Sequence, residues 1–296
     1  MFTIENENFR ATINQTGAEL QSVQNKKQDN YEYIWNDQSG KFWHRHSPIL
    51  FPAAGRSNND QYELNGKIYP MMQHGFARDY PWKVTNQTTE QITFELHENA
   101  DSLKIYPFKF TLAVTYQLND QGLNVSTKVT NNTEQEMPFA LGFHPAFNTF
   151  TRSDGSFDDY SLTLEPVNGN IKFFAPGTAP FINGQIEDLK ESDGNQIPLT
   201  HELLDDGFVL IANTEIDKST LSTPNHERSV TIECGNFPYL NVWSQEHANA
   251  PFICVEPFAG LPDIESDQPT DWYHKKGNSI VKPNETTELH FQIDFK

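Results

Sequence analysis

Residues 108–130 read FKFTLAVTYQLNDQGLNVSTKVT, and this stretch decides the fold class. Apolar side chains occupy every second position from Phe110 to Leu118, and after NDQG (119–122) the alternation resumes from Leu123 to Val129. A period of two is the pattern of a strand with one buried face. The stretch therefore predicts a long β-hairpin with its turn at residues 119–122.

The rest of the chain repeats this pattern in shorter pieces. Residues 92–96 and 289–295 alternate in the same way, and Asn65-Gly66 separates two further short strands at a pair that favours a tight hairpin turn. Helical spacing is confined to residues 199–206, and 18 Pro and 16 Gly punctuate the chain without marking a linker. We expect an all-β protein in which residues 1–296 form one large antiparallel β-sandwich domain.

The charge balance bears on the partners. The chain has 40 acidic and 21 basic residues, a formal charge of −19. Such a field repels phosphate backbones and anionic lipid, so nucleic acid and membrane partners are not expected. Only two cysteines are present and no signal-peptide pattern opens the sequence, so we expect a cytoplasmic protein without a disulfide framework. Whether it is a monomer or a homodimer is left open.

Common cofactor motifs are missing, and the candidate chemistry lies in segments where ionisable residues sit among Gly, Pro and aromatic residues. In SPILFPAAGRSNND (47–60), Arg56 follows a turn of small residues, and its guanidinium fork suits hydroxyls or an anion. In MMQHGFARDYPW (71–82), Gln73, His74 and Arg78 could line one wall of a pocket if Gly75 turns the backbone. Purely structural roles for these residues remain open at this point.

Two residues that precede prolines are the best candidates for proton transfer. His144 lies in PFALGFHPAFN (138–148), and a residue before proline is pushed into extended geometry. Its unperturbed pKa of about 6.5 allows it to give or take a proton at neutral pH. Glu256 ends an apolar strand in APFICVEPFAGLPD (250–263), where loss of water would raise its pKa toward that of a general base. A structural histidine and a structural ion pair are the alternatives.

The acidic segments are less informative. In HELLDDGFVLIAN (201–213), Asp205 and Asp206 precede a strand and could bind sugar hydroxyls, although Asp-Asp-Gly is also an ordinary turn. The acidic stretch 183–195 is expected to form a loop.

Five segments in register resemble the aldose 1-epimerase (galactose mutarotase) family, and most of all its bacterial LacX-like branch. They are FPAAGR (51–56), QHGFARDYPW (73–82), GFHPAF (142–147), DDGFVL (205–210) and CVEPFAG (254–260). The resemblance implies the family's large β "supersandwich" with an open sugar cleft on one sheet.

The resemblance also implies roles for individual residues. It makes His144 the general acid, Glu256 the general base, and Arg56 and His74 sugar-binding residues, with the family's aspartate at Asp206 in preference to its neighbour. The implied reaction exchanges the two anomers of a small-molecule hexose by ring opening and closure. It needs one acid and one base, and therefore neither a metal nor an organic cofactor.

Three rival functions remain. A hexose-6-phosphate 1-epimerase would use Gln73, Arg56 and Arg78 to contact its substrate. A glycoside hydrolase would pair Asp206 with Glu256 as its two carboxylates. A non-catalytic sugar-binding protein would keep the cleft and aromatic platforms such as Trp243 or Phe147 without turnover.

Overall fold

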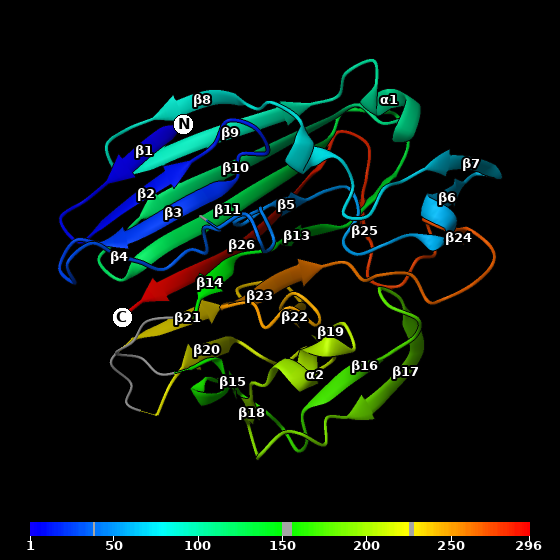
Figure 1. Cartoon of the computed structure of the whole chain (residues 1–296). Coiled ribbons are helices and arrows are strands. Elements are labelled where there is room, and N and C mark those ends of the chain that lie inside the picture. Colours follow the sequence, from blue (N-terminus) through cyan, green and yellow to red (C-terminus); the bar gives the residue numbers. More distant parts are fainter. Residues whose placement is uncertain (38, 150–155, 225–227) are drawn as a thin grey trace.

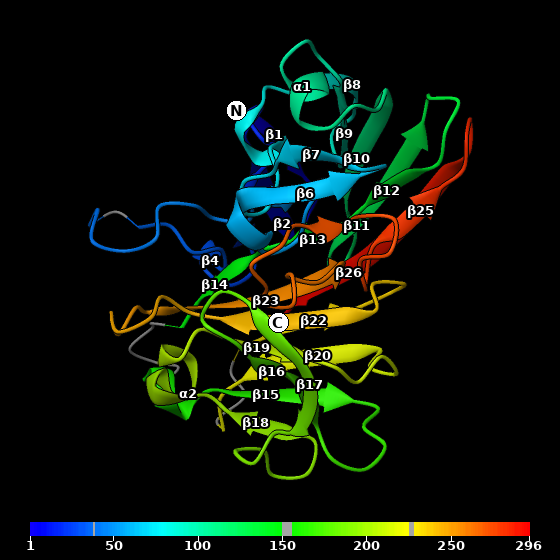
Figure 2. The ribbon, with the colours of Figure 1, turned by 90° about the vertical axis from the view of Figure 1, so that its right-hand side faces the viewer.

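The structure is a computed structural model that describes residues 1–37, 39–149, 156–224 and 228–296. Two large β-sheets face each other across the core, with three smaller sheets beside them (Figures 1 and 2). Within the described residues, sheet 1 has nine strands, in the order β18 (Gln196–Pro198), β15 (Ser161–Glu165), β20 (Lys218–Ser222), β21 (Ser229–Glu233), β26 (Thr286–Phe295), β11 (Gly122–Asn131), β10 (Phe110–Leu118), β9 (Gln91–His97) and β8 (Lys83–Gln87).

Sheet 2 carries the strands that matter for the site. Its order is β17 (Ile182–Asp188), β16 (Lys172–Pro176), β19 (Phe208–Ile211), β22 (Tyr239–Trp243), β23 (Phe252–Ala259), β13 (Leu141–Phe143) and β5 (Ile49–Leu50), and β14 (Ala146–Asn148) also pairs with β23. Neighbouring strands in both large sheets pair antiparallel. The predicted all-β antiparallel sandwich is confirmed.

The smaller elements extend the sandwich. Strands β1 (Phe2–Glu5), β2 (Phe9–Ile13), β3 (Leu20–Asn25) and β4 (Tyr31–Glu32) form one sheet, β6 (Gln61–Leu64), β7 (Lys67–Pro70) and β24 (Thr270–Asp271) a second, and β12 (Met137–Phe139) with β25 (Ser279–Val281) a third. Helical turns in the described residues are α1 (Ser102–Ile105), α2 (His201–Asp205), η1 (Asn58–Asp60), η2 (Ala77–Asp79) and η3 (Phe157–Asp159). No helix in the described ranges is both long and apolar enough to cross a membrane.

The predicted hairpin forms β10 and β11 in full register, from Phe110 opposite Asn131 to Leu118 opposite Leu123. The side chain of Asn119 closes the turn by accepting hydrogen bonds at 2.8 Å from the backbone nitrogens of residues 121 and 122. Glycine is required at position 122 because a Cβ there would lie 2.0 Å from a carbonyl oxygen of β26. The Asn65-Gly66 turn is confirmed as well, since both residues have positive φ angles of 53° and 77°.

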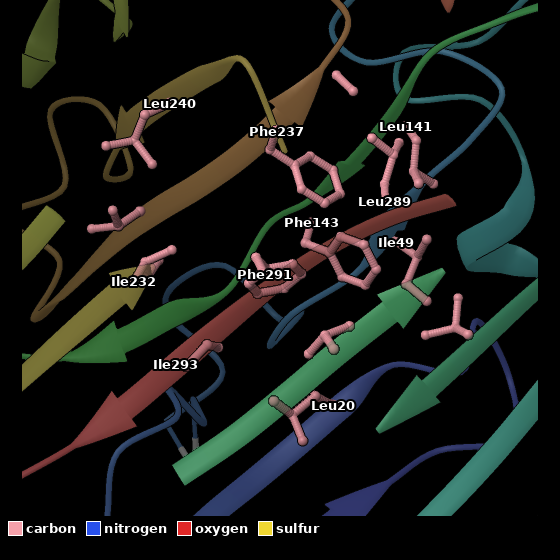
Figure 3. Packing of buried hydrophobic residues seen from close by; sticks show 14 of the residues in the cluster. Leu20, Ile49, Leu141, Phe143, Ile232, Phe237, Leu240, Leu289, Phe291 and Ile293 are labelled. Carbon is pink, nitrogen blue, oxygen red and sulfur yellow. The ribbon is translucent and has the colours of Figure 1, made fainter. Parts of the chain in front are cut away.

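The core fills the space between the two large sheets (Figure 3). Phe143 of β13 packs against Phe291 of β26 with ring centroids 4.8 Å apart, and Phe237 closes the cluster at 5.5–6.0 Å from both rings. This core covers the inner face of sheet 2. The outer face lies outside the core between the sheets and can carry a binding or catalytic site. The prediction of a loop at 183–195 was wrong in its first half, which forms the exposed edge strand β17.

Candidate active site

Strand β23 turns alternate residues to opposite faces of sheet 2, and this places Glu256 outside the main core. Ile253 and Val255 pack into the core between the sheets, whereas Phe258 belongs to a separate apolar cluster. Glu256 is fully buried. It pairs with Asn241 on the neighbouring strand β22, and Asn241 Nδ2 donates a hydrogen bond to Glu256 Oε1 at 3.0 Å. The carboxylate is therefore held by a neighbouring strand on the outer face of sheet 2.

His144 reaches the same place from the connection between β13 and β14. Its backbone nitrogen donates to the carbonyl of Pro48 at 3.1 Å, which ties the residue to the start of β5. Its Nε2 lies 3.5 Å from Glu256 Oε2, and the residue is 7% exposed. The two predicted proton carriers, 112 positions apart in the chain, thus meet in space.

The pair lies in a cavity of about 570 Å³. Its lining comprises Trp43, His44, Arg45, Gly55, Arg56, Gln73, His74, Arg78, His144, Ala179, Pro180, Phe208, Asn241, Trp243, Glu246, Glu256, Phe258 and Pro262. All the site residues proposed from the sequence are among them except Asp206. A cavity of this size accommodates a small organic ligand.

Asp206 is displaced from the cavity by the short helix that precedes it. Thr200 caps α2 by accepting a hydrogen bond from the backbone of Leu203, and Asp206 ends the helix with an exposed side chain. Asp205 instead accepts a hydrogen bond of 2.6 Å from the backbone nitrogen of His247. The first residue of this segment to line the cavity is Phe208, so the expected aspartate is not brought to the site.

A strained turn positions His74. His74 and Gly75 have φ angles of +68° and +70°, and a Cβ at Gly75 would lie 2.2 Å from the carbonyl oxygen of Phe51. Left-handed geometry at a non-glycine residue costs on the order of 1 kcal/mol and is typical of functional sites. His74 Nδ1 accepts a hydrogen bond of 3.1 Å from the backbone nitrogen of Gly55, so the hydrogen of the neutral ring is on Nε2. Burial holds the pKa of His74 well below its usual range, which makes it a neutral donor.

The arginines of the cavity are paired with carboxylates. Arg56 makes two hydrogen bonds of 2.8 Å to Asp60, and Arg45 bonds to Asp79 at 2.7 Å. Arg78 donates to the carbonyl of Gln73 at 2.9 Å and lies 3.9 Å from Asp79. Burial lowers the pKa of Arg78 to about 10, so it stays charged at neutral pH. Three arginines thus share two carboxylates, so the positive charge at the cavity is partly compensated.

The proton-carrying pair is shaped mainly by burial. Desolvation raises the pKa of Glu256 well above its usual value, and the hydrogen bond from Asn241 partly opposes this effect. Desolvation lowers the pKa of His144 to about 3; the residue's own carbonyl acts against this shift, and Arg78 and Arg45 add to it. Both shifts favour the uncharged form of each group, which is a protonated Glu256 beside a neutral His144 that together hold one proton.

One group of possible metal ligands occurs among the described residues. Ligand atoms of His144, Cys254 and Glu256 all lie within 4.8 Å of one another. Metals bind the thiolate, however, and burial raises the pKa of the Cys254 thiol well above its usual value. Cys254 also packs in an apolar cluster with Ala146 and Phe252. The donor set therefore fits acid–base chemistry better than a resident metal, and the absence of a metal stays a prediction.

Sequence reasoning missed Asn241 and Trp43. Asn241 is 6% exposed and interrupts the apolar strand YLNVW (239–243), and a buried amide in such a strand was a signal that could have found it. Trp43 stacks on His144 with ring centroids 4.8 Å apart, but it comes from the long connection between β4 and β5. No local pattern reveals such a contact.

Comparison with known proteins places the chain in a family. The sequence profile of the Aldose 1-epimerase family matches residues 1–294. The chain is 28% identical over 273 residues to Protein LacX of Lactococcus lactis subsp. lactis, covering 87% of each sequence. It resembles the crystal structure of a galactose mutarotase-like protein from Lactobacillus casei with a TM-score of 0.96, at 53% identity and with full coverage of both chains. A galactose mutarotase related enzyme from Lactobacillus acidophilus gives a TM-score of 0.91 at 30% identity, covering 100% of this chain and 97% of that one. The chain belongs to the aldose 1-epimerase family.

Proposed function

We propose that the protein is an aldose 1-epimerase that interconverts the α and β anomers of a free hexose, with His144 and Glu256 carrying the protons. The observation that carries the proposal is the 3.5 Å separation of His144 Nε2 and Glu256 Oε2 at the cavity wall. The two sugar oxygens that exchange protons are bonded to the same carbon, so their acid and base must also be close neighbours. The pair meets this requirement.

Ring opening uses the charged form of the pair. Glu256 as carboxylate takes the proton of the C1 hydroxyl, the C1–O5 bond breaks as the carbonyl forms, and O5 takes the proton from His144 Nε2. The result is an open-chain aldehyde, a protonated Glu256 and a neutral His144. No electrons leave the sugar, so neither an oxidant nor a reductant is required.

Ring closure uses the same groups in exchanged roles. After rotation about the C1–C2 bond, His144 removes the proton from the C5 hydroxyl, O5 attacks C1, and Glu256 returns a proton to O1. The state that begins this step is the neutral pair that burial favours. Holding one proton between two desolvated groups therefore suits both halves of the cycle, and acid–base catalysis of this kind contributes roughly 10²–10⁴-fold.

The remaining polar groups support binding of an uncharged sugar. His74 as a neutral donor and Arg56 can hydrogen-bond hydroxyls and stabilise charge that develops on oxygen. A phosphate ligand would have to compete with Asp60 for Arg56 and with Asp79 for Arg45. This compensation favours a free hexose over a hexose 6-phosphate.

The other rivals have less support. A glycoside hydrolase needs a second carboxylate across the sugar, and the candidate for that role, Asp206, is exposed at the end of α2. A non-catalytic binding protein has no need for a desolvated acid–base pair.

Magnetisation-transfer NMR on a small sugar panel tests the proposal. The protein is added to equilibrated glucose, galactose and glucose 6-phosphate, and the rate of exchange between the anomeric signals is measured against the same buffer without protein. We expect faster exchange of at least one free hexose, and none in the His144→Ala variant. Faster exchange of the sugar phosphate alone would favour the phosphate-sugar epimerase, and binding without faster exchange would favour the binding protein.

A further inference from the structure

We propose that Trp43 is a positioning residue for His144: its indole face fixes the orientation of the imidazole and stabilises the protonated ring. The inference rests on the proposed function for its catalytic consequence, but its physical basis is a contact that exists without substrate. Trp43 and His144 stack with ring centroids 4.8 Å apart and an interplanar angle of 29°.

Rings enclose His144 from three sides. Trp43 covers its face, while Trp243 and His74 approach with ring centroids at 5.4 Å and 5.7 Å and interplanar angles of 81° and 84°. Among the described residues, Nε2 of His144 faces Glu256 and the cavity.

The other ring nitrogen of His144, Nδ1, lacks among the described residues the hydrogen bond that commonly orients a proton-transferring histidine. A histidine that transfers protons is commonly oriented by a hydrogen bond from Nδ1 to a carboxylate or a carbonyl. Here Nδ1 of His144 is buried and makes no hydrogen bond with another residue in the described part of the chain. Apart from the influence of the residue's own carbonyl, the orientation of this ring therefore comes from packing, and Trp43 supplies the contacting face.

Trp43 is itself well held. Its carbonyl accepts a hydrogen bond of 2.9 Å from Trp35 Nε1, and the Trp35 ring stacks on Phe252 of β23 at 4.9 Å. Two residues further on, Arg45 is fixed to Asp79 of η2. The β4–β5 connection is thus anchored on both sides of Trp43, so the indole can act as a fixed wall.

The indole also acts electrostatically. The groups around His144 that bear charge or titrate are Glu256, His74, Arg78, Arg45 and Cys254. Of these, the two arginines disfavour a positive charge on His144, and ionised Glu256 favours it. An aromatic face attracts a cation that lies over it, so Trp43 adds to the attraction of Glu256 in the charged form of the pair.

Two variants that differ in the aromatic face test the role. Trp43→Leu removes the π face and Trp43→Phe keeps one, and thermal unfolding of both checks that the fold is retained. We expect Trp43→Leu to lower kcat by about three- to thirtyfold, the range of a desolvated cation–π contact, with little change in KM. The acid limb of its pH–rate profile, where His144 takes up a second proton for the pair, should move to lower pH by roughly 0.5–1.5 units. Trp43→Phe should recover most of both effects.

A measurement without turnover separates this inference from the proposed function. In protein with ¹⁵N-labelled histidine, the His144 resonances, assigned by their loss in His144→Gln, should shift in Trp43→Leu and stay close to wild type in Trp43→Phe. Unmoved resonances in Trp43→Leu, or equal effects of the two substitutions on kcat and on the acid limb, would overturn the role of Trp43. Absence of anomer exchange in the wild type would overturn the proposed function, and the resonances would still decide whether Trp43 controls the ring.

Discussion

Replacement of Asn241 by leucine should move the alkaline limb of the pH–rate profile. Asn241 Nδ2 donates to Glu256 Oε1 at 3.0 Å, and both side chains are buried. A hydrogen bond to a charged group contributes about 1.5–3 kcal/mol, and this bond is strongest when Glu256 is ionised. Its loss therefore raises the pKa of Glu256 further, by roughly 1–2 units. The neutral pair then loses the proton that Glu256 carries only at a higher pH, and the alkaline limb of kcat/KM moves upward by the same amount.

The assay is polarimetry of anomer exchange across the neutral-to-alkaline range, with a matched control from the same strands. Ser244, directly after β22, donates a buried hydrogen bond of 2.8 Å to the carbonyl of Phe252 in β23. Ser244→Ala removes a buried hydrogen bond between these strands without touching the acid–base pair. An alkaline limb that stays at its wild-type position in Asn241→Leu, or one that moves equally in Ser244→Ala, would refute the reasoning.

Two further predictions concern stability. The pKa of Glu256 is raised in the folded state, so the folded protein binds this proton more tightly than the unfolded chain does. The resulting stabilisation is fully present below the unfolded pKa, and it is lost as the pH rises toward the folded pKa. Because Gln resembles the protonated acid at every pH, Glu256→Gln should gain stability over wild type as the pH rises through this window, by up to about 1.4 kcal/mol per pH unit. Urea unfolding at acidic and neutral pH measures this gain. A difference in unfolding free energy between variant and wild type that does not change with pH would contradict it. Separately, Lys275 Nζ lies 2.5 Å from Asp263 Oδ1, with side-chain exposures of 4% and 0%. Lys275→Met leaves the buried carboxylate of Asp263 without its cation and should lower the free energy of unfolding by about 3–5 kcal/mol, measured by urea unfolding. Adding Asp263→Asn should recover part of that loss. If Lys275→Met alone is as stable as wild type, the pair is not buried as described.

The fold was predictable because its main signal is local. Alternation over residues 110–129 sets both strands of the hairpin and the face that each side chain occupies, and the Asn65-Gly66 pair sets a turn through its backbone geometry alone. His144 and Glu256 were detectable for a similar reason, since each is an ionisable residue in an apolar segment before a proline. Local sequence chemistry marked them before their meeting in space was known.

The rest of the site depends on contacts between distant segments. Asp206 was expected in the cavity, but its direction is set by where α2 ends, and a difference of one residue at a helix end turns a side chain away. Trp43 reaches His144 from the β4–β5 connection, which is anchored at Trp35 and Asp79. Such placement follows from packing, which no period in the sequence encodes.

The central claim is that Glu256 and His144 transfer protons and do more than bind sugar. Magnetisation-transfer NMR of wild type, Glu256→Gln and His144→Ala, at sugar concentrations where ligand-observed binding is equal, separates the two roles. We expect each variant still to bind the hexose that the wild type turns over, while its catalysed exchange falls by roughly 10²-fold or more. Exchange at the wild-type rate in either variant would contradict it.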